Sequence, residues 1–408
     1  MNAFAMDTVN TPGDLAGRVV WQADGPQRGL HNQRPDLLPR LSRGQPASAL
    51  PGLVSSLLSM CGHAHLLASR LAIAAAQGQA RTLTREEARA LQLETLREHL
   101  RRMWLDWPRL WPGPGDASVA QLSELHGCPV LHGPLPRMVA EAPQVLDGTR
   151  AWLATHVFDL DPSLWLSHWQ DHGLTWLHTW SARTATWPAR WLDQVHRSAA
   201  ALTQPLRPWW PDDTASLAQL AQRIAADPAH VRQPLWPAPG GIGPVETGPW
   251  CRLHQRVATG PDASCSAEWR LAGRLVDLAR LALPDHSGHQ TLAGSHCLGA
   301  TGLNVLAQGS LSLPHHTGLS WLEMARGTLL HWVQLDGTGP DARVLSAQVL
   351  APTEWNFHHD GPVAQVLDRL NEPDLQVQAA LAVAAWDPCV PFAVCHGQPR
   401  PQQEPHDA

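Results

Sequence analysis

Each end of the chain carries a cysteine within a short group of residues that commonly bind metals. Residues 60–65 read MCGHAH and residues 387–396 read DPCVPFAVCH. Cysteine thiolates bind soft transition metals, so Cys61 and Cys389 are candidate ligands of one site. They can share it only if the fold brings opposite ends of a 408-residue sequence together. The alternative interpretation is that both are small, buried core residues, as free cysteines usually are.

Composition excludes several classes of function. The formal net charge of -6 disfavours a surface for nucleic acid or for an anionic membrane, because both attract basic proteins. No apolar run approaches the roughly 20 residues of a membrane helix, and the N-terminus lacks the charged-then-apolar pattern of a secretion signal. Seven scattered cysteines suit reduced thiols rather than a disulfide framework. We therefore predict a cytoplasmic protein without membrane insertion and without a nucleic-acid partner.

Hydrophobic periodicity predicts a mainly helical chain with a small strand component. The apolar spacing indicates a helix over residues 53–76, with Cys61 inside it or at a break. Thr84 followed by Glu87 is a capping box, which opens a second helix to about residue 103. Residues 327–335 and 343–350, separated by the turn sequence DGTGP, are typical of a β-hairpin. Further helices are expected over residues 213–226, 266–283 and 375–386, and residues 105–150 are expected to be irregular.

Tryptophan is concentrated between residues 152 and 210. The pairs Trp165/Trp169, Trp176/Trp180 and Trp187/Trp191 have the spacing that places two side chains on one face of a helix. Such faces are either core or an exposed docking surface for a partner, and the sequence leaves both interpretations open.

The two terminal motifs resemble the cysteine motifs of the large subunit of nickel-iron hydrogenases. Those motifs read C-G-x-C and D-P-C-x-x-C-x-x-H, and this chain keeps only the first cysteine of each. Ala64 and Phe392 stand where the resemblance places the two metal-bridging thiolates. A nickel-iron site with four thiolates cannot form from two, so the resemblance implies a protein that is not a hydrogenase. No general acid, base or nucleophile constellation stands out from spacing alone, so we predict that the chain is not an enzyme.

Three internal segments extend the resemblance, in the order that the large subunit has them. Residues 246–252 resemble E-x-G-P-x-x-R, residues 323–332 resemble E-A-P-R-G-x-L-x-H-W, and residues 351–356 resemble V-P-[ST]-T-W-N. The match is best to the accessory branch of the superfamily, the HupK/HoxV-type hydrogenase maturation proteins. It implies an α+β, mostly α fold that is nickel-iron hydrogenase large-subunit-like, with a helical body and a small antiparallel β part. Residues 1–396 would form a single domain, and residues 397–408 a polar, disordered tail.

The resemblance also implies a site for an incomplete cofactor. Cys61 and Cys389 correspond to the terminal nickel ligands, Arg326 to an arginine that donates hydrogen bonds to a cyanide on the iron, and Thr353 to a hydroxyl that contacts the second cyanide. Asp387 would support the site, or cap a turn. We expect a transiently held Fe(CN)2(CO) unit, with nickel associated with the family but not expected here. The implied partners are the hydrogenase large-subunit precursor, a small hydrogenase maturation chaperone and the cofactor-assembly complex.

Three alternatives stay open from the residues themselves. Arg326 could pair with Glu323 or Asp360 as ordinary structural charge. The extra donors His63, His65, Cys395 and His396 could bind zinc, but their spacing matches no standard zinc module, and core or surface positions are the favoured interpretation. The whole chain could instead be a structural or regulatory subunit of a hydrogenase-related complex that binds no metal.

Overall fold

The computed structural model describes residues 17–110, 119–205, 207–209, 211, 213–238, 241–254, 264–286, 300–370 and 375–395. The predicted tail, 397–408, and His396 lie outside these residues. The helices are α1 Leu38–Ser42, α2 Leu50–Leu57, α3 Gly62–Ala76, α4 Arg85–Arg101, α5 Trp107–Leu110, α6 Val119–His126, α7 Leu135–Ala140, α8 Ala142–Leu153, α9 Pro162–Arg183, α10 Trp187–Ala201, α11 Thr214–Ala226, α12 Pro249–His254, α13 Ala267–Ala282, α14 Pro352–Asn356, α15 Pro362–Leu367 and α16 Leu375–Trp386. The strands are β1 Val19–Gln22, β2 Gly29–Asn32, β3 Thr203–Pro205, β4 Trp236–Ala238, β5 Gly241–Gly243, β6 Ser264–Ser266, β7 Gln308–Leu313, β8 Thr317–Met324, β9 Gly327–Leu335, β10 Val344–Leu350 and β11 Phe392–Cys395. The fold class is α+β and mostly α, as the sequence predicts.

A four-stranded antiparallel sheet in the order β10-β9-β8-β7 forms the main β part. The predicted hairpin of β9 and β10 is confirmed, and its strands pair from Val344 with Leu335 to Leu350 with Leu330. The sequence does not reveal β7 and β8, because β8 is buried on both faces and shows no clean alternation of apolar and polar residues. The β8–β9 hairpin ends in a tight turn between Met324 and Gly327, which carries Arg326.

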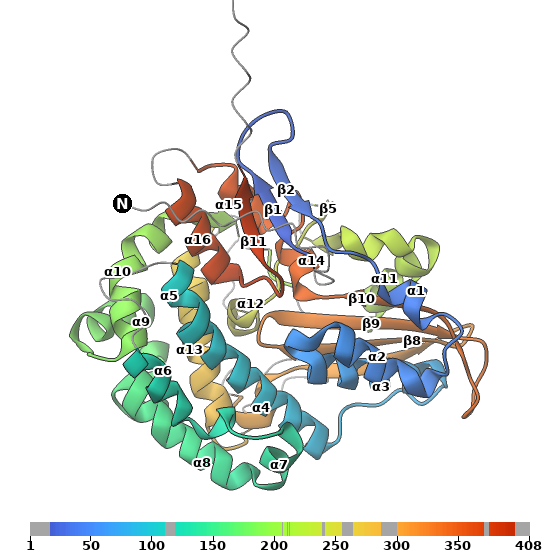
Figure 1. Ribbon diagram of the computed structural model, residues 1–408, viewed down its shortest axis with the longest axis horizontal. Coiled ribbons are helices and arrows are strands. Elements are labelled where there is room, and N and C mark those ends of the chain that lie inside the picture. Colours follow the sequence, from blue (N-terminus) through green and yellow to red (C-terminus); the bar gives the residue numbers. More distant parts are fainter. Residues whose placement is uncertain are drawn as a thin grey trace, which may run out of the picture.

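The predicted helix over residues 53–76 is broken shortly before Cys61, because α2 ends at Leu57 and α3 begins directly after Cys61. The chain bends by 103° between its two arms, Ala47–Leu57 and Ser59–Ala76. The second arm, α3, packs against β8 and β9 (Figure 1). No single helix in the described part of the chain is long and apolar enough to cross a membrane, and this bent pair passes that test only by length and composition.

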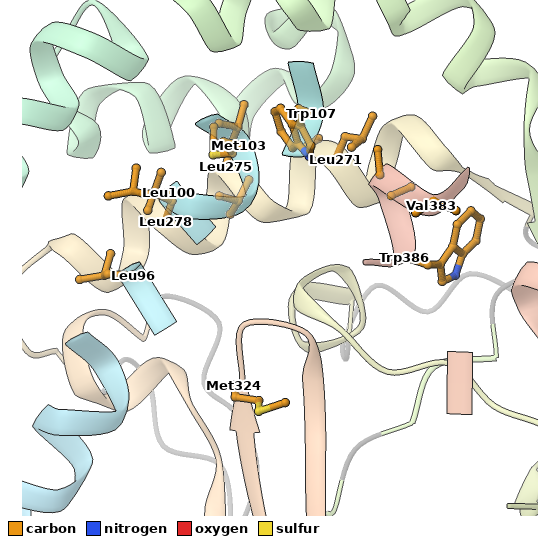
Figure 2. Packing of buried hydrophobic residues seen from close by; sticks show 14 of the residues in the cluster. Leu96, Leu100, Met103, Trp107, Leu271, Leu275, Leu278, Met324, Val383 and Trp386 are labelled. Carbon is orange, nitrogen blue, oxygen red and sulfur yellow. The ribbon is translucent and has the colours of Figure 1, made fainter. Parts of the chain in front are cut away.

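The helical body is organised around α13, which runs through its centre (Figure 1). Figure 2 shows α4 and the turns that follow it laid along α13, with Leu96, Leu100 and Met103 close to Leu275 and Leu278. The capping box at the start of α4 is confirmed, because the Thr84 hydroxyl accepts from the Glu87 amide and the Glu87 carboxylate accepts from the Thr84 amide.

The expectation that residues 105–150 are irregular is wrong. The segment contains α5, α6, α7 and most of α8. Prolines disguise these helices in the sequence, but in α7 and α8 proline occupies one of the first two helical positions. There its missing N–H costs nothing, since the first amides of a helix have no partner within the helix.

The tryptophan pairs form core. The helices that carry them, α9 and α10, both pack on α13. Trp165 and Trp169 stack with ring centroids 6.1 Å apart, and Trp187 and Trp191 are also buried. The core interpretation therefore holds for these residues, while Trp176 is only partly buried.

The two ends of the chain meet in a small three-stranded sheet of order β11-β1-β2. Strand β1 pairs with β11 in parallel, from Val19 with Phe392 to Gln22 with Cys395, and this is the one non-antiparallel pair among the described strands. The first strand thereby fixes the chain just beyond Cys389, so the fold meets the requirement set by the two cysteine motifs.

Candidate functional site

A cavity of about 200 Å³ lies where the two ends of the chain meet, and both motif cysteines line it. Cys61 reaches it from the break before α3, and Cys389 from the loop between α16 and β11. Apolar side chains such as Leu38, Leu58 and Met324 form much of the wall. The polar residues in the wall are Arg34, Asp36, Ser59, His65, Arg232 and Glu354.

Arg326 lies behind Cys61. Its Nη1 donates a hydrogen bond to the Cys61 sulfur at 3.0 Å, and its guanidinium meets carboxylate oxygens of Glu98 and Asp387, each at 3.4 Å. The carboxylates that pair with it are therefore Glu98 and Asp387. Asp360 instead contacts His359 at 2.9 Å, and Glu323 faces Arg252 at 4.0 Å.

Burial raises the pKa of the Cys61 thiol well above its usual range, and the charge of Arg326 opposes that rise. A buried thiol of this kind stays protonated until a cation or an added positive charge stabilises its anion. Arg326 is the nearest such charge, since it donates directly to the sulfur.

Thr353 has the same relation to Cys389. The Thr353 hydroxyl donates to the Cys389 sulfur at 3.1 Å, and the Cys389 amide donates to the hydroxyl oxygen at 3.1 Å. Thr353 lies in the first turn of α14. Each motif cysteine is therefore held by one of the two polar residues that the sequence assigns to the site.

Asp387 holds three arginines together. Its oxygens lie 2.8 Å from Nε of Arg102, 3.0 Å from Nη1 of Arg274 and 3.4 Å from Nε of Arg326. None of these contacts has the alignment of a hydrogen bond, so the attraction is one of charge. Burial alone would raise the pKa of Asp387, but the three arginines hold it well below the usual range of a carboxyl.

Three guanidinium groups lie behind the two thiols, each in an ion pair. Arg102, Arg274 and Arg326 face Asp387 and Glu98, and Arg102 also pairs with Asp106 at 2.9 Å. Arg102, Arg274, Arg326, Asp387 and Glu98 are buried. Arg326, which donates directly to the Cys61 sulfur, is the positive group placed to favour a thiolate or a small anion there.

An ion pair that the sequence analysis did not identify lies in the cavity wall. Arg34 contacts Glu354 at 2.5 Å, and the carboxylate of Glu354 also accepts from the Ala351 amide. The two residues lie far apart in the sequence, so no local pattern joins them. The detectable signal was Glu354 itself, which stands where the motif V-P-[ST]-T-W-N has threonine.

Two apolar residues occupy the positions of the missing thiolates. Ala64 and Phe392 are both buried, and Phe392 packs against Phe357.

The extra donors of the two motifs do not form a metal cluster with one another within the described residues. Cys395 lies in β11 opposite Gln22, and its carbonyl accepts from the Ala23 amide. The backbone amide of His63 donates to Glu94. The clusters of metal-binding residue types in the described ranges include none of His63, His65 and Cys395.

His65 faces His331 of β9 in a buried pair whose ring nitrogens are 3.0 Å apart. Burial lowers the pKa of His65 to about 3, assisted by Arg34, and lowers the pKa of His331 well below its usual range. Both imidazoles are therefore neutral in the folded protein at pH 5.5, whereas both take up a proton in the unfolded chain. The unfolded state binds more protons, so the free energy of unfolding falls as the pH is lowered through the unfolded pKa.

We expect His331→Gln to flatten this pH dependence. From pH 7 to pH 5.5 each buried histidine lowers the free energy of unfolding by about 1 kcal/mol, so the variant should lose that much less than the parent protein. Urea unfolding at the two pH values measures the difference. The control is His172→Gln, which changes an exposed histidine. Equal pH dependence in His331→Gln and the parent would show that the pair is protonated in the folded state.

Two proteins with sequences similar to this chain are both hydrogenase expression/formation proteins. The chain is 37% identical over 394 residues to the hydrogenase expression/formation protein HoxV of Cupriavidus necator, covering 93% of this chain and 95% of that protein. It is 29% identical over 369 residues to the hydrogenase expression/formation protein HupK of Bradyrhizobium diazoefficiens, covering 88% and 89%. No family model matches.

Similar solved structures include a nickel-iron-selenium hydrogenase chain from D. vulgaris Hildenborough, with a TM-score of 0.48, 13% identity and coverage of 89% of this chain and 92% of that one. A chain of an NAD+-reducing nickel-iron hydrogenase has a TM-score of 0.46 and 14% identity, with coverage of 89% and 92%.

Proposed function

Because this chain belongs to the family of hydrogenase expression/formation proteins that includes HoxV and HupK, we propose that it serves in the maturation of a nickel-iron hydrogenase. It acts as an accessory scaffold that holds an Fe(CN)2(CO) unit transiently, before the unit passes to the catalytic large subunit. The observation that carries the proposal is that Cys61 and Cys389, from opposite ends of the chain, line one cavity.

The cavity suits an iron fragment as cargo. Two thiols at its wall offer soft ligands, and the cavity of about 200 Å³ leaves room between mostly apolar side chains. Apolar walls keep water away from the carbonyl and cyanide ligands while the unit is held. Nickel is not part of the proposed cargo, because Ala64 and Phe392 offer no donor at the two further thiolate positions.

The charged cluster behind the thiols supports an anionic cargo. Cyanide and thiolate both add negative charge, which a buried site accepts only next to donors of positive charge. Arg326 carries five N–H donors in a rigid fork, so it can serve the Cys61 sulfur and a cyanide together. Thr353 takes the matching role beside Cys389, and Asp387 fixes the position of Arg326.

The number of thiolates favours release over permanent binding. Two sulfur ligands hold an iron unit less firmly than the four thiolates of a complete site, so transfer to a four-thiolate acceptor is downhill. The partners that follow from this role are the precursor of the hydrogenase large subunit, a small maturation chaperone and the cofactor-assembly complex. The names of the relatives as expression/formation proteins agree with an accessory protein that is not an enzyme.

Infrared spectroscopy tests the proposal. We expect protein purified without air, from cells that also make the maturation machinery, to show bands of metal-bound CO and CN. Cys61→Ala and Cys389→Ala should each abolish the bands, because each removes half of the sulfur ligands. Cys128→Ala and Cys251→Ala are matched controls, since both change buried cysteines that do not line the cavity. Thr353→Val, which removes the hydroxyl at nearly constant volume, should shift the CN bands.

The alternative is a structural or regulatory subunit without metal. The observation that favours it is the burial of Cys61, which raises the pKa of the thiol well above its usual range. Protein free of iron and of CO and CN bands, even when the maturation machinery is present, would overturn the scaffold proposal in favour of this alternative. Bands that persist in both cavity variants would place the cargo elsewhere.

A further inference from the structure

A second group of metal-binding residue types lies in the helical body, apart from the cavity. His178 of α9, His196 of α10 and Glu268 of α13 bring one imidazole nitrogen each and a carboxylate oxygen within 4.8 Å of one another. None of the three lines the cavity of the two cysteines. The three helices pack together, with α9 and α10 both against α13 on one side of the molecule (Figure 1).

Glu268 is the unusual member of this group. Its side chain is only 3% exposed, and Nε2 of His178 lies 2.5 Å from its Oε1. A carboxylate this deeply buried requires a positive partner or several hydrogen bonds. The two imidazoles face it from neighbouring helices, with their ring centroids 5.0 Å apart. The arrangement supplies two nitrogens and one oxygen around a common point.

We propose that His178, His196 and Glu268 bind a first-row divalent transition-metal ion of the zinc type. Imidazole and carboxylate together suit Zn²⁺, Co²⁺ or Ni²⁺, whereas Mg²⁺ and Ca²⁺ prefer oxygen ligands alone. The ion takes the place of the proton that now joins His178 to Glu268. Metal–ligand bonds near 2 Å place donor atoms about 3.3 Å apart, so small side-chain rotations complete the set.

The exposure of the residues gives the site an entry path. The side chain of His178 is 44% exposed and His196 is partly exposed, so an ion reaches the site from solvent, and Glu268 forms its floor. Three protein ligands leave a fourth position open to water or to a donor from another molecule. The ion would link α9, α10 and α13, and it is independent of the iron unit proposed for the cavity.

Zinc titration of the full chain, after removal of metals by a chelator, tests the site. We expect one Zn²⁺ bound in the micromolar range or tighter, together with a rise in the melting temperature. His178→Ala, His196→Ala and Glu268→Gln should each weaken binding by at least about tenfold, because even outer partners of metal ligands contribute this much. His172→Ala is the matched control, since it removes an exposed histidine of the same helix and leaves the three ligands intact.

Cobalt distinguishes this site from the two cysteines. Co²⁺ bound to imidazole and carboxylate gives weak visible bands without the intense charge-transfer bands of a thiolate ligand, and the signal should survive in Cys61→Ala. The metal-free variants should melt at temperatures close to that of the metal-free parent. A chain that binds no Zn²⁺, or that binds it equally well in all three ligand variants, would overturn the proposal. A thiolate spectrum lost in Cys61→Ala would do the same.

Discussion

Replacing Asp387 with asparagine is expected to lower the free energy of unfolding by about 3–5 kcal/mol, the usual cost of removing one partner from a buried charge group. The substitution keeps the size of the side chain and removes only its charge. Arg102, Arg274 and Arg326 would then remain buried around a neutral amide. Asparagine also tolerates the left-handed backbone at this position, where φ is 52°, so the change in stability reports charge and not strain.

Chemical denaturation of the purified protein measures this loss. Asp360→Asn is the matched control, because that carboxylate is 73% exposed and pairs with a surface histidine at 2.9 Å. We expect the control to change stability by less than about 0.5 kcal/mol. A loss below about 1 kcal/mol in Asp387→Asn would mean that the remaining carboxylates, Glu98 beside Arg326 and Asp106 beside Arg102, together with water already stabilise the arginines.

Removing the charge of Asp387 should also affect the binding of iron in the cavity. Asp387 precedes Pro388 and Cys389, and it contacts the arginine that donates to Cys61. The same variant is therefore expected to weaken retention of iron under the conditions of the infrared experiment. Stability and retention can be separated by comparison with a core variant that is equally destabilised and lies far from the cavity.

Local signals in the sequence were sufficient for many elements. Thr84 and Glu87 mark the start of α4, Asp213 caps α11, and the DGTGP turn separates β9 from β10. Each of these features is determined within a few residues, where hydrogen-bond geometry and side-chain type act directly. The prediction that residues 105–150 are irregular was wrong because local signals are ambiguous there. Proline indicates a break in a helix unless the start of the helix is already known.

The candidate site was predictable only in part. The positions of Cys61, Cys389, Arg326 and Thr353 follow from the resemblance of short motifs, and the contacts within the two pairs agree with their assignment to one region. The charged residues around Arg326 could not be predicted in this way. Glu98 comes from α4, Arg102 from the turn after it and Arg274 from α13, and these meet only through tertiary packing. Neither the hydrophobic periodicity nor the motif spacing of the sequence predicts such contacts between distant residues.

Replacing Gly318 with alanine is expected to lower the free energy of unfolding by about 3 kcal/mol, at the upper end of the usual cost of overpacking. Gly318 lies in β8 directly under α3. A Cβ there would overlap the carbonyl oxygen of Ala72 and lie 2.5 Å from the amide nitrogen of Ala76 and 3.0 Å from the Cβ of Ala75. Two of these atoms are backbone, so the helix has to move, and α3 is the helix that begins after Cys61.

Thermal or urea unfolding measures the effect, and Gly337→Ala provides the control. Gly337 has nothing within 4 Å of an added Cβ, and its substitution should change stability by no more than about 0.5 kcal/mol. In a strand without close neighbours, backbone entropy would make alanine more stabilising than glycine. The close approach of α3 is therefore the reason that we expect Gly318→Ala to lower the free energy of unfolding. Because α3 begins directly after Cys61 and contributes His65 to the cavity lining, Gly318→Ala should also make Cys61 react faster with a thiol reagent. A stable variant with an unreactive Cys61 would show that the sheet, and not the helix, absorbs the added methyl group.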